Sequence, residues 1–250
     1  RGLGDVYKRQ GKMGFAMRDR IKKEWGDIPI ILMSTNDEIC ERRYLFSGEN
    51  TGADTASYMP LSELRHTYNF TFVEIPEYYE QTIDLMLHMQ PKMRKLVYVS
   101  DLLANNVRQN RQIQEYIDRK HHGLEYEWLQ VSEETSDSIQ SYLMSDDMEI
   151  GLLLSSMYYS RKSAFGSPIL VTDDIRLVAA TPHPVFTLKQ GYMDYGTVGG
   201  FFPDEAYLQE RTLDIFKKML SGVSMKDIPF VYSDISYPMM DYKLAVGCRT

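Results

Sequence analysis

Polar side chains follow several apolar runs of the sequence, where buried parallel strands are expected to end. Because the carboxyl ends of parallel strands line the ligand crevice of open α/β sheets, the pattern predicts a small-molecule site. Short polar side chains would supply hydrogen bonds, and the tyrosines would supply area for stacking. The charged residues would bind the charged groups of a ligand. The alternative is that these residues cap helices and close turns. The candidates are Thr35, Asn36 and Asp37; Ser100 and Asp101; Ser155, Ser156 and Tyr158; and Lys189, Gln190 and Tyr192.

Catalysis is the second chemistry that these residues could support. Asp101 or Asp37 could act as a general base in an α/β enzyme with a Rossmann-like or flavodoxin-like sheet. Asp101 could also be a phospho-acceptor. That role would need an acidic pair after the first strand to bind magnesium and a lysine after the last strand, and the sequence does not contain this set at those positions. The sequence contains no nucleophile elbow, Walker loop or GxGxxG motif. Binding is therefore favoured over catalysis.

No metal or cofactor is predicted. The five histidines show no ligand spacing, and Cys40 and Cys248 match no metal or redox motif. The net charge of -7 argues against a nucleic-acid partner, because binding to phosphates needs a basic surface. No apolar run approaches the roughly 20 residues needed to span a bilayer.

The predicted elements alternate between strands and helices. Three continuous apolar runs, Ile28–Met33, Leu96–Ser100 and Ile150–Leu154, are typical of strands buried on both faces of a parallel sheet. Further strands are predicted at 70–74, 124–129 and 228–232, and helices at 76–89, 104–120, 135–144 and 204–220. The alternation predicts parallel α/β architecture.

Two other stretches carry specific expectations. A helix is predicted over Met13–Trp25, with Phe15, Met17 or Arg18, Ile21 and Trp25 near one side. The glycine-rich stretch Pro184–Phe202 predicts a strand, a tight switch and a second strand, directly before a helix capped by Asp204. We interpret the switch as the place where the chain passes from one α/β lobe to another.

Short pieces follow one another along the chain in a recognisable order. They are Ile28-Pro-Ile-Ile, Asn50-Thr-Gly, Met89-Gln-Pro, Lys95-Leu-Val-Tyr-Val-Ser-Asp, Pro184-Val-Phe, Gly196-Thr-Val-Gly-Gly, Met219-Leu-Ser-Gly and Asp227-Ile-Pro. This ordered series resembles the ABC-type substrate-binding family with the type I periplasmic-binding-protein fold, and the resemblance covers most of residues 21–242. In particular, the chain resembles the version that forms the extracytoplasmic sensor region of bacterial membrane histidine kinases.

The resemblance implies two α/β lobes with parallel sheets flanked by helices and a ligand held between them. The first lobe is expected to be incomplete, with an unpaired sheet edge. The expected parts are a leader at 1–10 outside the fold, lobe 1 at 11–75, lobe 2 at 76–190, and a return to lobe 1 with a C-terminal connection at 191–250.

The function implied is extracytoplasmic sensing of an unidentified small molecule. Closure of the lobes would signal to a membrane-anchored kinase module in the same chain. The alternative within the family is a free solute-binding subunit of an ABC transporter. A homodimer is a further expectation, because sensor regions often pair about a two-fold axis.

Overall fold

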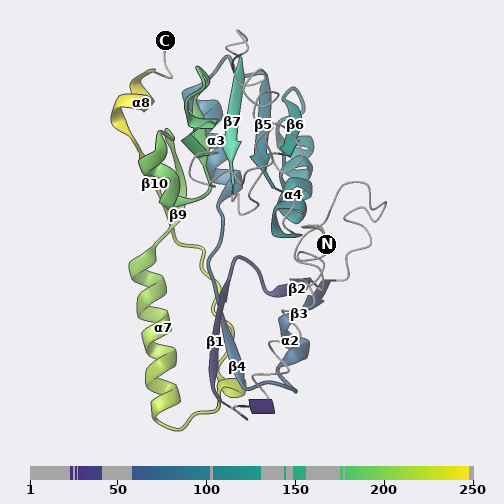
Figure 1. The fold of residues 1–250 in the computed structure, drawn as a ribbon, viewed down its shortest axis with the longest axis vertical. Coiled ribbons are helices and arrows are strands. Elements are labelled where there is room, and N and C mark those ends of the chain that lie inside the picture. The colour runs from purple at the N-terminus through teal and green to yellow at the C-terminus, as the bar shows by residue number, and fades with distance from the viewer. Residues whose placement is uncertain are drawn as a thin grey trace, which may run out of the picture. The chain divides into compact units, whose positions relative to one another are not determined.

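The computed structural model describes residues 23–24, 26, 28–40, 58–101, 104–130, 144, 149–155, 175–176 and 178–247. These residues form two compact units (Figure 1). Unit 1 contains the described residues up to Pro76 together with Pro203–Ile235, and unit 2 contains Glu77–Phe202 together with the chain from Ser236. The chain therefore passes between the units three times.

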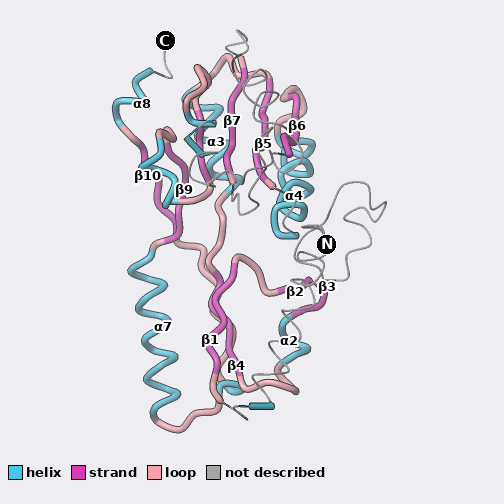
Figure 2. Tube along the Cα trace, in the orientation of Figure 1, coloured by secondary structure: helices cyan, strands magenta, loops and turns pink. Residues whose placement is uncertain are grey.

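Unit 2 is built on a six-stranded sheet, drawn in magenta in Figure 2. The strand order is β10-β9-β8-β7-β5-β6, and β5 pairs in parallel with both β6 and β7, as β8 does with β7 and β9. The bounds are β5 Lys95–Ser100, β6 Glu125–Gln130, β7 Ile150–Leu154, β8 Val185–Thr187, β9 Gly199–Pro203 and β10 Ser236–Met240.

The central strands of unit 2 are buried on both faces, as their apolar runs predict. On one face, Leu96 and Tyr98 pack with residues of α3 (Tyr79–Met89) and α4 (Ala104–Lys120). On the other face, Val97 and Val99 pack with β7, β8 and residues 175 and 178. The apolar face of α4 is buried against this sheet, and its residues are Val107, Ile113, Tyr116 and Ile117. The α/β fold class predicted from the sequence is therefore confirmed.

The glycine-rich stretch joins β8 to β9 through the 3-10 helix η2 (Gln190–Tyr195). Gly196 closes that helix in the left-handed conformation, with φ of 98°. A Cβ on Gly200 would overlap the carbonyl oxygen of Thr187 on the neighbouring strand. The glycines therefore allow the turn and the close approach of the two strands.

Unit 1 contains two small sheets. Parallel β1 (Ile30–Ser34) and β4 (Phe70–Glu74) form one, and antiparallel β2 (Glu38–Cys40) and β3 (Tyr58–Pro60) form the other, followed by α2 (Leu61–Leu64). Among the described residues, β1 pairs only with β4. The prediction that this run is buried on both faces is wrong for β1, because the Met33 side chain is 43% exposed.

Helix α7 (Glu205–Leu220) begins and ends where the sequence predicts. The Asp204 carboxylate accepts a hydrogen bond from the Tyr207 backbone N–H at 3.0 Å, which caps the first turn. Gly222 follows the last turn with φ of 88°. Leu208 and Ile215 are buried against β4 and the chain around Ile228, whereas Phe216 on the predicted inner face is 44% exposed.

The prediction of a strand over residues 228–232 is wrong, because most of this segment is not paired with another strand. Only Val231 forms a ladder contact, a parallel bridge to Val73. Pro229 has no N–H to donate, and the Thr71 hydroxyl instead donates to the carbonyl oxygens of Ile228 and Pro229. The segment follows the 3-10 helix η3 (Met225–Asp227), and the described chain ends with α8 (Tyr242–Gly247).

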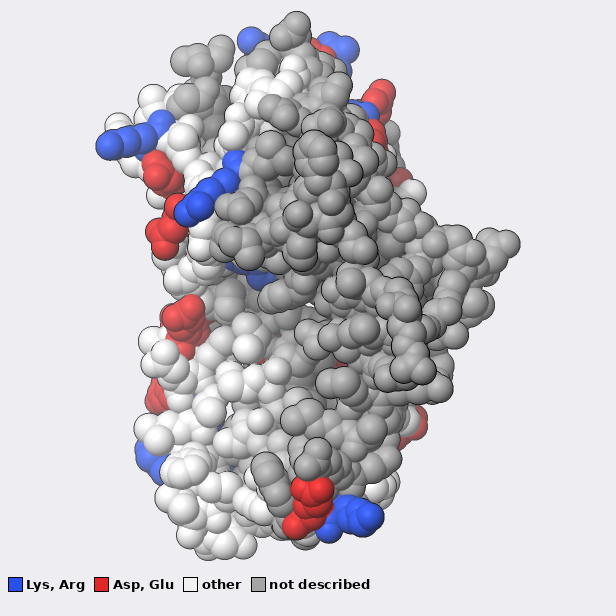
Figure 3. All heavy atoms as spheres, viewed as in Figure 1, with Lys and Arg blue, Asp and Glu red and all other residues white. Residues whose placement is uncertain are grey.

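Several predictions lie outside the described residues. Of the helix predicted over Met13–Trp25, the structure describes only Lys23 and Glu24, and both are helical. Of the helix predicted at 135–144, it describes only Met144. No helix within the described ranges is long and apolar enough to cross a membrane. On the face drawn in Figure 3, acidic and basic side chains of the described residues are interspersed.

Candidate functional site

Polar side chains gather at the carboxyl end of the unit 2 sheet. Ser100 and Asp101 end β5, Ser155 ends β7, and all three are fully buried. The side-chain amide of Asn106, in the first turns of α4, donates to Asp101 Oδ1 at 2.6 Å. Ser155 Oγ lies 3.3 Å from Asn106 Oδ1. Residues from two strands and one helix thus form a single hydrogen-bonded cluster.

Gln109 is the centre of this network. Its Oε1 accepts hydrogen bonds from the Tyr98 hydroxyl at 2.7 Å and from the Ser155 hydroxyl at 2.9 Å. Its Nε2 donates to the carboxylate of Glu77. Buried polar groups need such partners, because each unpaired group would cost about 1–3 kcal/mol. The cluster is therefore held rigidly by its own hydrogen bonds.

Tyr98 remains a neutral hydrogen-bond donor within the network. Burial raises the pKa of Tyr98 well above its ordinary value, and the nearby charge of Glu77 raises it further. The hydroxyl proton is consequently retained at neutral pH and stays available for Gln109. The Tyr98 hydroxyl therefore remains a donor to Gln109 over the physiological pH range.

Lys189, in the loop after β8, forms an ion pair with Glu77. The neighbouring Gln190 accepts a hydrogen bond from the Tyr237 hydroxyl at 3.3 Å. Tyr192 lies in η2 and packs partly against the core formed by β5, β7 and β8. Of these three predicted residues, Lys189 is connected to the polar cluster, through Glu77 and Gln109.

The remaining predicted residues of unit 1 form a turn after β1. Asn36 Oδ1 accepts from the backbone N–H of Glu38 at 3.1 Å, and its Nδ2 donates to Thr35 Oγ1 at 3.3 Å. The Asp37 carboxylate accepts from the Tyr232 hydroxyl at 2.7 Å. These contacts agree with the turn-forming alternative for Asn36.

The pKa of Tyr232 is raised to about 12, first by burial and then by the hydrogen bond and charge of Asp37. The phenol is therefore protonated at neutral pH and donates to the carboxylate. Asp37 is thus engaged as an acceptor within unit 1, just as Asp101 is engaged by Asn106 in unit 2.

Sequence reasoning missed three members of the cluster, Glu77, Asn106 and Gln109. A signal was present for two of them. Asn106, Gln109 and Ile113 follow one another at spacings of three and four residues, so the two polar side chains continue the core-facing stripe of α4. Two predicted site residues, Ser156 and Tyr158, lie outside the described residues. No group of three or more His, Cys, Asp or Glu side chains with metal-binding geometry occurs among the described residues.

Comparison with solved structures identifies the architecture. The chain superposes on the ligand-free, open form of a substrate-binding protein with adhesive properties from Clostridium difficile, with a TM-score of 0.55, 15% identity and 72% of this chain covered. The chain has the fold of a substrate-binding protein. It spans 58% of that neighbour's chain.

Two further solved structures superpose on this chain. A conserved domain protein from Vibrio cholerae gives a TM-score of 0.58 at 15% identity, covering 88% of this chain and 73% of its own. The ABC domain from Streptococcus pneumonia, solved in complex with L-Trp, gives 0.56 at 14% identity, covering 72% and 58% respectively. No family model and no curated protein matches the sequence. At these identities the likeness concerns the fold.

Proposed function

We propose that this chain is a binding domain for a small polar molecule, held at the carboxyl end of the unit 2 sheet. The observation that carries the proposal is the buried cluster of Ser100, Asp101, Asn106 and Ser155. Substrate-binding proteins share the fold, and parallel α/β sheets place ligands at this end of the strands. The predicted site residues Ser156 and Tyr158 directly follow Ser155 in the sequence and belong to the same proposal.

The chemistry of the cluster favours a ligand rich in hydrogen-bond donors. A buried carboxylate at Asp101, with hydroxyl and amide groups beside it, suits a protonated amine or a set of hydroxyls. L-Trp, the ligand of the Streptococcus neighbour, has such an amine. Amino acids and sugars are therefore the first classes to test.

A thermal-shift screen with amino acids, sugars, nucleobases and small aromatics tests this proposal. Binding to the native state stabilises it by about 2.7 kcal/mol at a hundredfold excess over Kd. The hit is then titrated by calorimetry into Asp101→Asn, with Asp118→Asn on the exposed side of α4 as the matched control. Loss of binding in the first variant alone supports the site. Equal binding by both variants, or no shift with any class, overturns it.

A finer proposal concerns the parent protein. We infer from the sequence resemblance that the domain lies on the extracytoplasmic side of the membrane and serves a two-component histidine kinase through closure of its lobes. The natural gene tests this directly. A membrane helix and kinase core encoded downstream support the sensor, whereas a gene that ends shortly after Tyr242 supports the transporter subunit. The homodimer is tested by light scattering with and without the ligand.

A further inference from the structure

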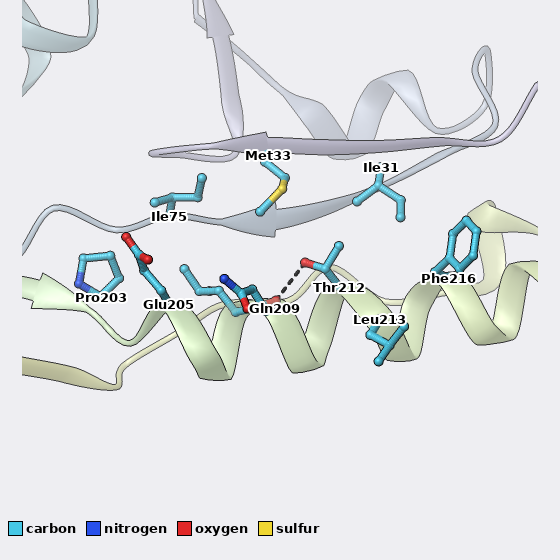
Figure 4. A pocket seen from close by; sticks show the side chains of 10 residues that line it. Ile31, Met33, Ile75, Pro203, Glu205, Gln209, Thr212, Leu213 and Phe216 are labelled. Carbon is cyan, nitrogen blue, oxygen red and sulfur yellow. Dashed lines mark hydrogen bonds between the residues drawn. The ribbon is translucent and has the colours of Figure 1, made fainter. Parts of the chain in front are cut away.

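Unit 1 contains an apolar groove that the proposed binding function does not use. Its volume is about 540 Å³, and it runs between β1 and α7 (Figure 4). In Figure 4, Ile31 and Met33 point from β1 toward α7, and Phe216 lies toward one end of the groove. Thr212 also lines the groove, but its hydroxyl donates a hydrogen bond to the Leu208 carbonyl oxygen of the same helix at 2.8 Å.

The groove exists because the apolar face of α7 is wider than the surface that covers it. Leu208 and Ile215 pack with Val73 of β4 and are buried. Leu213 and Phe216, on the adjacent side of the helix, are 51% and 44% exposed. Met33 of β1, opposite them, is 43% exposed. The groove therefore has exposed apolar side chains on both walls, a surface suited to packing of another apolar element.

The chain before β1 has the sequence to cover it. Met13, Met17, Ile21 and Trp25 recur every four residues, which places them along one side of a helix. The two described residues of this segment, Lys23 and Glu24, are helical and exposed. Gly26 has φ of 71°, the left-handed conformation that commonly ends a helix.

We propose that Met13–Trp25 packs as an amphipathic helix into the groove between β1 and α7. The connection is short, since only four residues separate Trp25 from Ile30, the first residue of β1. Short helix–strand connections keep the helix beside the strand that it precedes. The opposite face of β1 is already covered, because Ile30 and Leu32 pack with Phe70, Phe72 and Leu61. The groove is therefore the face that remains for this helix.

Length and charge agree with this arrangement. A helix of 13 residues is about 20 Å long, and a strand of five residues spans about 17 Å. The segment carries four basic residues (Arg18, Arg20, Lys22 and Lys23) and two acidic ones (Asp19 and Glu24), and is therefore positive overall. The charged residue that lines the groove, Glu205, has the opposite sign. With a helix on this face, β1 would be buried on both sides, as its continuous apolar sequence favours.

Trp25 provides a direct probe in the full chain. The sequence has two tryptophans, so Trp128→Phe leaves Trp25 as the single reporter. We expect emission at short wavelength and weak acrylamide quenching in this parent. Phe216→Asp on the groove wall should shift emission to longer wavelength and increase quenching. Lys218→Asp, on the opposite side of α7, should change neither.

A reciprocal pair of variants keeps the proposal falsifiable if Phe216→Asp fails to fold by circular dichroism. Met17→Asp, on the proposed inner side, should lower the melting temperature and expose Trp25, whereas Asp19→Asn, on the opposite side of the proposed helix, should do neither. Strong quenching of Trp25 in the parent, or no response to either inner variant, overturns the proposal. A dimer that Phe216→Asp converts to a monomer without any change at Trp25 would assign the groove to a second copy and overturn it too.

Discussion

Lys189 and Glu77 form an ion pair in which the two side chains are only 24% and 12% exposed. The pair joins the loop after β8 to the first residue of unit 2 that follows Pro76. Glu77 is bound on its second oxygen by Gln109, so the ion pair and the polar cluster form one network. The network thereby anchors the chain at a passage between the two units.

Glu77→Gln tests the contribution of this pair. The change leaves the Lys189 ammonium with a neutral partner in a largely buried place, and we expect a loss of about 2 kcal/mol in unfolding free energy. Urea denaturation measures it. Glu80→Gln is the control, because its partner Arg119 is 66% exposed and exposed pairs contribute less than about 1 kcal/mol. A smaller loss for Glu77→Gln than for Glu80→Gln would refute this account.

Gly200→Ala tests the close approach of β8 and β9. The added Cβ would overlap the Thr187 carbonyl oxygen, and both residues belong to paired strands with little room to move. We expect a loss of about 3 kcal/mol, at the upper end of overpacking costs. Gly191→Ala is the matched control from the same glycine-rich stretch, since no atom lies within 4 Å of its added Cβ. Equal melting temperatures of the two variants would contradict the packing argument.

Stability should fall as pH rises above about 10. Burial raises the pKa of both Tyr98 and Tyr126 above the ordinary value. In that range the unfolded chain loses the phenolic proton while the folded chain retains it, so alkaline conditions favour unfolding. Each such tyrosine adds a slope of up to about 1.4 kcal/mol per pH unit.

Urea denaturation at successive pH values measures this slope. Tyr126→Phe removes one titrating group and should flatten the curve above about pH 10. Near neutral pH the same variant should lose only the hydrogen bond from the Tyr126 hydroxyl to Asn110 Oδ1, of 2.6 Å, or about 1 kcal/mol. An unchanged alkaline slope in the variant would show that Tyr126 does not drive the effect.

The sequence predicted the strands of unit 2 better than those of unit 1, for a physical reason. Continuous apolar runs such as Leu96–Ser100 become strands when helices cover both faces, and β5 is covered in this way. The similar run at Ile28–Met33 formed β1 but left Met33 exposed. At 228–232 the apolar pattern suggested a strand, yet Pro229 cannot supply the N–H that a ladder requires.

The candidate site was predictable where it depends on strand ends. Ser100, Asp101 and Ser155 follow directly from the ends of β5 and β7, and the structure brings them together. Gln109 was not found, because polar residues on a helix are ordinarily assigned to its solvent side. Only the packing of α4 on β5 shows that Gln109 faces Tyr98. At Asn36 the same side chain serves both a turn and a ligand site in the sequence pattern, and its observed contacts are those of a turn.

The three passages of the chain between the units set an order for folding during synthesis. Five of the six strands of the unit 2 sheet lie between Lys95 and Pro203, so most of that sheet can pair before the rest of the chain emerges from the ribosome. Strand β4 of unit 1 must wait for Val231, more than 150 residues later, to complete its second edge. The unit that contains β1 and β4 is therefore completed only after most of the unit 2 sheet has been synthesised.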